Sequence, residues 1–195
     1  MSQAISNIVE NKTIEENENK ETKNLITVPE NNINLEENNL IVQEDEKIKE
    51  NVEIKRPIED GIYAIESKLN SSKYVSVENG SMKSGANVQV WGNKYLKYNQ
   101  FKVTYLNNGY YSIICQNSDK SLDVYHAGKE SGTNIAQGNY NGNSAQQWII
   151  KEAKDGYYYI MSKCNNLYLD IYHANIENGT NIQMSNYSRK WCTNV

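Results

Sequence analysis

Residues 109–148 read GYYSIICQNSDKSLDVYHAGKESGTNIAQGNYNGNSAQQW, and diverged copies of this stretch lie on both sides of it. The three copies begin at Gly61, Gly109 and Gly156, which are 48 and 47 residues apart. The two histidines of the chain, His126 and His173, are also 47 residues apart. Three copies of so short a unit indicate one domain with internal threefold symmetry, in which each unit covers a face of its neighbours.

Each unit predicts four short β-strands. It opens on a turn dipeptide, such as Asn108-Gly109, that tolerates positive φ. Large residues then alternate with a period of two, as in Tyr111 and Ile113, which places them on one face of a strand. No helical period is present in the units. Twelve short strands in three units therefore predict an all-β fold.

The second predicted strand of each unit carries one polar residue between two apolar ones. In the second unit Leu122 and Val124 are expected to point inward, so Asp123 between them is expected to point outward. The same reasoning places Ser76 of the first unit and Asp170 of the third on the outer face. These two aspartates are the first candidates for a polar site.

The first 60 residues differ from the rest in composition. They carry 7 Lys/Arg and 15 Asp/Glu, whereas all 15 Tyr, 3 Trp and the single Phe lie beyond residue 60. Low hydrophobicity with high net charge cannot offset the entropy lost on ordering. We predict that residues 1–57 are a disordered acidic, Asn-rich tail or linker, whose short apolar pairs could alternatively dock a partner. Residues 58–195 are predicted to be the folded domain, with units at 61–108, 109–155 and 156–195.

Several classes of function find no support in the sequence. No apolar run approaches the roughly 18 residues of a membrane span, and the first residues lack the basic and apolar regions of a secretory signal. The three cysteines are odd in number and lack metal spacing, which argues against a zinc site or a disulfide framework. The lysines of the domain are scattered, which disfavours nucleic-acid binding. We expect no metal and no cofactor.

The second unit resembles a known family. Its LDV, SGTNI and Q-x-W segments, the last being Gln146-Gln147-Trp148, resemble those of ricin-type β-trefoil lectins and related carbohydrate-binding modules. The sequence of this unit is also similar to that of lectin modules found beside clostridial enzymes and toxins. The resemblance covers roughly residues 58–195. It implies a six-stranded barrel capped by three hairpins, with one core aromatic per unit: Phe101, Trp148 and Trp191.

The resemblance also implies shallow sugar sites, one in each unit. In such a site an Asp accepts hydrogen bonds from vicinal hydroxyls and a ring covers the apolar face of the sugar. The first unit has a ring, Trp91, but Ser76 replaces the Asp. The second has Gly138 at the ring position and the third has Ser185. We therefore expect binding to be retained best in the second unit, then in the third, then in the first.

The candidate carbohydrate-binding residues follow from this comparison. In the second unit Tyr125, His126 or Tyr140 would supply the platform in place of Gly138. The third unit has a rim loop four residues shorter than the second. The complete set is Asp123, Tyr125, His126, Tyr140, Asn143, Gln146, Asp170, Tyr172, His173 and Gln183.

Two other interpretations stay open. Asp123 and Asp170 could be turn or strand-end residues that satisfy backbone amides. The chain could also be a trefoil with decayed sugar sites that binds a protein partner, as a toxin-complex subunit or an enzyme accessory module.

We do not expect an enzyme, because equivalent carboxylates at separate corners of a threefold ring lie too far apart for a glycosidase pair, which needs roughly 5–10 Å. The resemblance suggests an extracellular location, although the sequence shows no signal peptide.

Overall fold

The computed structural model describes residues 6–10 and 56–186. These residues form twelve β-strands and five single-turn 3-10 helices. The first unit contains β2 (Gly61–Ser67), β3 (Asn70–Val77), η1 (Glu78–Gly80), β4 (Val88–Trp91), η2 (Lys97–Asn99) and β5 (Phe101–Tyr105). The second contains β6 (Tyr111–Cys115), β7 (Ser121–Val124), η3 (Tyr125–Ala127), β8 (Ile135–Gly138), η4 (Ser144–Gln146) and β9 (Trp148–Glu152). The third contains β10 (Tyr158–Ser162), β11 (Tyr168–Ile171), η5 (Tyr172–Ala174) and β12 (Ile182–Ser185). One further strand, β1 (Ser6–Glu10), precedes the units.

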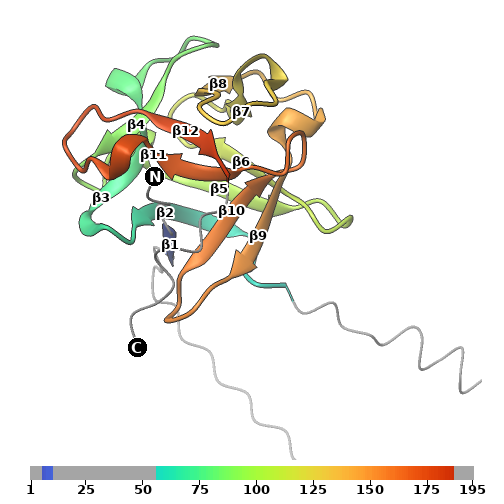
Figure 1. Cartoon of the computed structure of the whole chain (residues 1–195), viewed down its shortest axis with the longest axis horizontal. Helices are drawn as coiled ribbons and strands as arrows, with labels where there is room; N and C mark the ends of the chain where they lie inside the picture. The colour runs from blue at the N-terminus through green and yellow to red at the C-terminus, as the bar shows by residue number, and fades with distance from the viewer. Residues whose placement is uncertain (1–5, 11–55, 187–195) are drawn as a thin grey trace, which may run out of the picture. The chain divides into compact units, whose positions relative to one another are not determined.

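Six of these strands pair into a closed ring. The order β2, β5, β6, β9, β10, β1 returns to β2, and every neighbouring pair is antiparallel. The remaining strands form the hairpins β3–β4, β7–β8 and β11–β12, one in each unit. Figure 1 shows β1 beside β2, with β7 and β8 at the opposite end of the domain. The predicted all-β, threefold β-trefoil fold is confirmed.

The core lies inside the ring, as the alternation of large residues predicts. Tyr111 and Ile113 of β6 are buried, and so are the aromatic residues Phe101 and Trp148 that begin β5 and β9. The third aromatic of the predicted set, Trp191, lies outside the described residues.

The asparagines that repeat every 47 residues meet between the hairpins. Asn134 donates through Nδ2 to Oδ1 of Asn87 at 2.9 Å, and Asn181 donates in the same way to Asn134 at 2.9 Å. Isolated bridges join Asn134 to Gln183 and Asn181 to Gln89. This chain of amides links the three units where the hairpins converge.

Within residues 1–57, which the sequence predicts to be a disordered tail, Ser6–Glu10 forms the strand β1. This strand pairs with β2 from Ser6↔Ser67 to Glu10↔Tyr63, and it pairs with β10 at Ser6↔Tyr158. Composition alone could not reveal it, because the two sheet edges that β1 joins supply the backbone hydrogen bonds. The other residues of the predicted tail, 1–5 and 11–55, lie outside the described residues, and disorder there stays a prediction.

The prediction that Ser76, Asp123 and Asp170 point outward holds only in part. Asp123 is half-buried, whereas Ser76 and Asp170 are buried. The second strand of each unit is covered on its outer side as well as toward the core, so a period of two does not separate an exposed face from a buried one.

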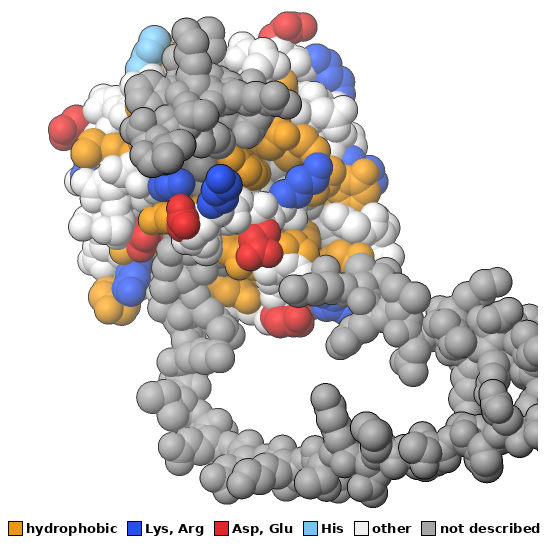
Figure 2. Space-filling view, turned by 60° about the horizontal axis from the view of Figure 1, so that its bottom comes forward, with side chains coloured by type: hydrophobic (Ala, Val, Ile, Leu, Met, Phe, Trp, Pro, Cys, Tyr) orange, Lys and Arg blue, Asp and Glu red, His pale blue; other side chains and the backbone are white. Residues whose placement is uncertain are grey.

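The surface agrees with the scattered charges of the sequence. On the face that Figure 2 shows, basic and acidic side chains are interspersed with apolar ones rather than gathered by sign. Among the described residues no helix is long and apolar enough to cross a membrane.

Candidate functional site

The second unit carries an open pocket of about 310 Å³. Asp123 of β7 lies in its wall, with Tyr125 and His126 of the following 3-10 turn. Gly138 at the end of β8 and Asn143 before η4 complete the part of the wall that the sequence analysis singled out. Binding sites for small molecules typically measure roughly 300–1,000 Å³, so this pocket is at the lower end of that range.

A buried amide holds the Asp123 carboxylate. Gln146 Nε2 donates to Asp123 Oδ2 at 2.7 Å and to the backbone oxygen of Asn139 at 2.9 Å. Gln146 Oε1 accepts from the backbone N–H of Asn141 at 2.8 Å. The Gln146 side chain is 1% exposed. Gln146 was predicted to contact the sugar, but the structure places it behind the carboxylate, where it orients Asp123.

The turn after Asp123 presents an aromatic ring at the pocket. The backbone of His126 and Ala127 has φ of 52° and 51°, a left-handed conformation that costs on the order of 1–3 kcal/mol per residue. The Tyr125 and His126 rings pack edge to face with centroids 4.1 Å apart. Tyr125 is 46% exposed. The strained turn therefore fixes an exposed ring beside the carboxylate.

The Asp123 carboxylate packs against the Cα of Gly138 and leaves no room for a side chain there. A Cβ added at Gly138 would lie 2.6 Å from Asp123 Oδ2 and 3.3 Å from Gln146 Nε2. Neither atom can give way without breaking the hydrogen bond between them. The glycine at position 138, in place of an aromatic residue, therefore leaves the room that the Asp123 carboxylate occupies.

Tyr140 and Asn143 have different places. Asn143 lines the pocket, and its Oδ1 accepts from the backbone N–H of Ala145 at 2.9 Å as the cap of η4. Tyr140 is exposed but is not part of the pocket wall. Of the three platform candidates, the structure brings Tyr125 and His126 to Asp123 and leaves Tyr140 apart.

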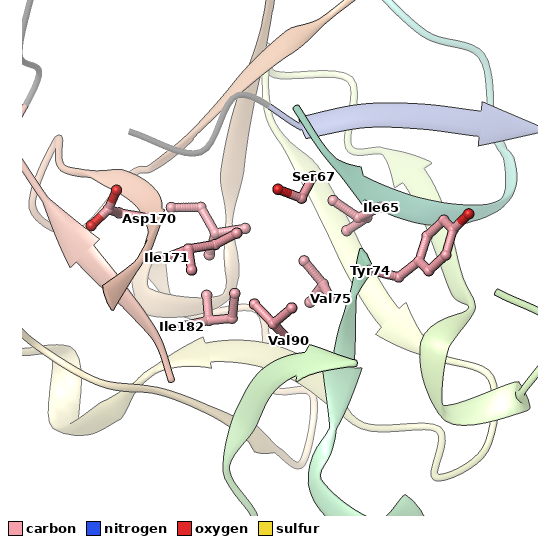
Figure 3. A pocket seen from close by; sticks show the side chains of 9 residues that line it. Ile65, Ser67, Tyr74, Val75, Val90, Asp170, Ile171 and Ile182 are labelled. Carbon is pink, nitrogen blue, oxygen red and sulfur yellow. The ribbon is translucent and has the colours of Figure 1, made fainter. Parts of the chain in front are cut away.

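The third unit repeats the turn but not the open carboxylate. Tyr172 and His173 pack edge to face with centroids 4.0 Å apart, and His173 has φ of 52°. Asp170, however, is only 2% exposed, and its Oδ2 accepts from Gln183 Nε2 at 3.2 Å. Asp170 lines a small cavity of about 10 Å³ with apolar residues such as Ile171 and Ile182, and Figure 3 shows its carboxylate at the margin of that cluster. Asp170 therefore does not face an open pocket in this structure, and its contact with a ligand stays a prediction.

The first unit has no carboxylate to offer at this position. Ser76 and Gln89 are buried, and Trp91 is half-buried. Asn178 of the third unit lies against this region: its Oδ1 accepts from Gly92 N at 3.1 Å and from Lys73 Nζ at 2.8 Å. The ranking of the first unit as the weakest sugar site stays a prediction.

Sequence reasoning missed one wall of the second-unit pocket. Gly85 of the first unit lines it, and its backbone N–H donates to the Gln137 carbonyl at 2.7 Å. A repeat compared only with its own copies does not reveal what a neighbouring unit contributes. The threefold symmetry could have revealed this contribution of Gly85, because it brings the third segment of each unit beside the next unit.

Metal ligands do not gather in the described part of the chain. Within residues 6–10 and 56–186, no three His, Cys, Asp or Glu side chains could hold a metal ion together. Cys115 and Cys164 are free thiols there, and Cys192 lies outside the described residues.

Comparison with known proteins agrees with the fold and the repeats. The model of the family described as ricin-type β-trefoil lectin domain-like matches residues 48–138 and 97–185. No curated protein matches the sequence. Among solved structures, a designed threefold-symmetric protein, ThreeFoil, is 32% identical with a TM-score of 0.64, over 66% of this chain and 91% of its own.

Two further solved structures extend the comparison. An exo-β-1,3-galactanase from Clostridium thermocellum is 28% identical with a TM-score of 0.58, over 60% of this chain and 25% of its own. A ricin B-like lectin from Macrolepiota procera, solved in complex with lactose, is 16% identical with a TM-score of 0.57, over 69% of this chain and 91% of its own. The chain thus spans a quarter of the galactanase and nearly the whole of the other two.

Proposed function

The chain belongs to the ricin-type β-trefoil lectin domain-like family, and on this premise we propose that it is a non-catalytic carbohydrate-binding module with its principal site in the second unit. The observation that carries the proposal is the half-buried Asp123 carboxylate in the wall of an open pocket. Gln146 fixes Oδ2, and among the described residues no donor reaches Oδ1.

Each pocket residue has a role in this proposal. The Asp123 carboxylate accepts hydrogen bonds from two neighbouring sugar hydroxyls, and such charge-assisted bonds are about twice as strong as neutral ones. The exposed Tyr125 ring, fixed against His126, covers C–H groups on the apolar face of the sugar. Asn143, at the rim, offers its amide nitrogen while its oxygen caps η4.

The proposed ligand is a terminal galactose or N-acetylgalactosamine, with a polysaccharide such as xylan as the alternative. The names of similar structures support this choice: one is a β-1,3-galactanase, one was solved with lactose, and an earthworm lectin was solved with GalNAc. A single shallow site binds with a Kd near 1 mM, about −4 kcal/mol. Useful affinity would then come from several copies on one surface.

We also propose the domain division into a tail, residues 1–57, and a trefoil, residues 58–195, amended so that β1 belongs to the barrel.

The rival function is a trefoil that binds a protein partner in place of sugar. The buried Asp170 and the missing carboxylate of the first unit favour that rival, because neither unit presents an exposed carboxylate at this position.

The test is glycan binding by the intact chain and two matched variants. We expect binding to galactose, lactose or GalNAc surfaces, and a loss of more than tenfold in Asp123→Asn, which keeps an acceptor for Gln146. Asp119→Asn changes an exposed Asp of the same unit outside the pocket and is expected to bind within twofold of the wild type. A cooperatively folded wild-type protein that binds no glycan would favour the partner-binding rival.

A further inference from the structure

A loop of the first unit, residues 81–86, lies against the second unit beside the open pocket. The Gly85 N–H donates to the Gln137 carbonyl at 2.7 Å, and the Gln137 N–H donates to the Ala86 carbonyl at 2.9 Å. Gly85 lines the pocket together with Asp123. A ligand held by the Asp123 carboxylate therefore meets a wall that another unit supplies.

The other two unit boundaries have an equivalent backbone bond. The Gly132 N–H donates to the Met184 carbonyl at 2.8 Å, and the Gly179 N–H donates to the Val90 carbonyl at 2.9 Å. The accepting residue carries an apolar side chain at both of these boundaries, whereas at the boundary of the first and second units it is Gln137. The boundary that borders the open pocket thus has a polar side chain where the other two have none.

The Gln137 side chain holds the loop in place. It is 1% exposed, and its Nε2 donates to the Ser81 carbonyl at 2.6 Å and to the Lys83 carbonyl at 2.8 Å. Its Oε1 accepts from Ser118 Oγ at 2.6 Å. Such a buried amide fixes its partners, because breaking one of these bonds leaves a buried polar atom without a partner. Residues 82–85 are exposed, so these hydrogen bonds rather than core packing set the position of the loop.

A side chain at position 85 would point into the pocket. A Cβ added at Gly85 meets no atom within 4 Å, so the space beside it is open. The equivalent Gly179 shows the direction, because a Cβ added there would lie 3.9 Å from Gln89 Oε1. Gln89 has in β4 the place that Ala136 of the pocket wall has in β8. The Cβ direction of position 85 is therefore over Ala136, on the side where Asp123 lies.

We propose that the sugar site of the second unit is shared by two units: the ligand contacts the loop 81–86 at Gly85, and Gln137 is the positioning residue that holds this loop against the pocket. The shared site rests on the proposed function and adds a limit on the ligand. A sugar whose hydroxyls bind Asp123 can carry a substituent toward Gly85 only as far as this fixed wall allows, and a clash there discriminates between sugars.

The experiment compares substitutions of two equivalent glycines in the full-length chain. Gly85→Asn and Gly132→Asn place the same side chain at φ of 81° and 93°, and neither added Cβ meets an atom within 4 Å. Asparagine is among the residues that tolerate positive φ best. Of the two glycines, only Gly85 lines the second-unit pocket.

Both variants are titrated with whichever of galactose, lactose and GalNAc the wild type binds best. We expect at least tenfold weaker binding in Gly85→Asn and binding within twofold of the wild type in Gly132→Asn. An equal loss in both variants would mean that backbone strain, and not the wall, weakens binding, and it would overturn the shared site.

Gln137→Met tests the positioning role. Methionine has a similar volume and is buried at the equivalent position, Met184, but it removes the three side-chain hydrogen bonds. We expect a cooperatively folded variant in which amide hydrogen exchange at Gly85 speeds up at least tenfold and sugar binding weakens at least fivefold. Gly85→Asn should then weaken binding less in the Gln137→Met background than in the wild type, because both changes act on the same wall. Unchanged exchange at Gly85, or fully additive losses of binding, would contradict the positioning role.

Two outcomes separate the shared site from the proposed function. Binding that is lost in Asp123→Asn but unchanged in Gly85→Asn would support the proposed function and overturn the shared site. A folded wild-type protein that binds no sugar would overturn both. The exchange rate at Gly85 in Gln137→Met reports on the loop without any ligand, so it tests the hold of Gln137 on the loop by itself.

Discussion

Gln146 and Asp123, 23 residues apart in the chain, share a hydrogen bond of 2.7 Å from Nε2 to Oδ2. The bond joins the end of η4 to the middle of β7. Trp148, two residues after Gln146, is completely buried in the barrel. The polar residue of the Q-x-W segment thus holds the candidate site, and the aromatic residue anchors the same segment in the core.

Gln146→Leu should therefore impair the domain in two ways. It keeps roughly the side-chain volume but removes three hydrogen bonds and leaves the Asn141 N–H without its acceptor. We expect a loss of about 1–3 kcal/mol in the free energy of unfolding, together with at least tenfold weaker glycan binding. Urea denaturation and binding to a lactose surface measure the two effects. A destabilised variant that binds as tightly as the wild type would show that Gln146 does not orient Asp123.

Gly138→Ala should weaken binding although it adds one methyl group. The new Cβ would lie 2.6 Å from Asp123 Oδ2, so the carboxylate must turn away from Gln146. We expect at least tenfold weaker binding and a moderate loss of stability, measured by glycan titration and thermal unfolding. Gly92→Ala is the control, because its added Cβ meets nothing closer than 3.7 Å. Equal binding by both variants would mean that the position of the carboxylate is not critical.

Tyr74 makes the stability depend on pH in the alkaline range. Burial, and next the Glu66 carboxylate, raise the pKa of Tyr74 above its usual 10.0, and its hydroxyl donates to the Ser71 carbonyl at 2.8 Å. The folded state then holds the phenolic proton more tightly than the unfolded state. The stabilisation is complete below about pH 10 and is lost as the pH rises through the raised pKa of the folded state.

Tyr74→Phe should lose this dependence. We expect its urea midpoint to fall less steeply above about pH 10 than that of the wild type. Tyr140→Phe, which changes an exposed phenol, should keep the wild-type slope. Identical slopes for all three proteins would refute the assignment to Tyr74.

The repeats made the fold predictable, because spacing and period are properties of the chain itself. The turn dipeptides, the alternation around Tyr111 and the 47-residue period of Asn87, Asn134 and Asn181 all have a direct counterpart in the strands and in the amide chain between the hairpins. β1 was not predictable in this way, because it belongs to no unit and is held by two sheet edges distant in sequence.

The candidate site was predictable only as a set of residue types. Asp123 and Asp170 occupy equivalent positions and are followed by the same Tyr-His pair, yet the first lines a pocket of about 310 Å³ and the second an apolar cavity of about 10 Å³. The roles of Gln146 and Gly138 also depend on side-chain geometry rather than on spacing. Equivalence in sequence reports common ancestry of the units, whereas exposure depends on what each neighbouring unit places over the position.

The Asp170→Ala variant should show that Asp170 and Asp123 have different roles. Asp170 is buried and accepts from Gln183 at 3.2 Å, so its removal leaves that amide without a partner beside the cavity. We expect a loss of about 1–3 kcal/mol in unfolding free energy and glycan binding within twofold of the wild type. Asp123→Asn is expected to show the opposite pattern, with binding lost and stability retained, when both are measured by glycan titration and urea denaturation. If Asp170→Ala loses binding as severely as Asp123→Asn, the third unit carries a working site, and the closed carboxylate must open when the sugar binds.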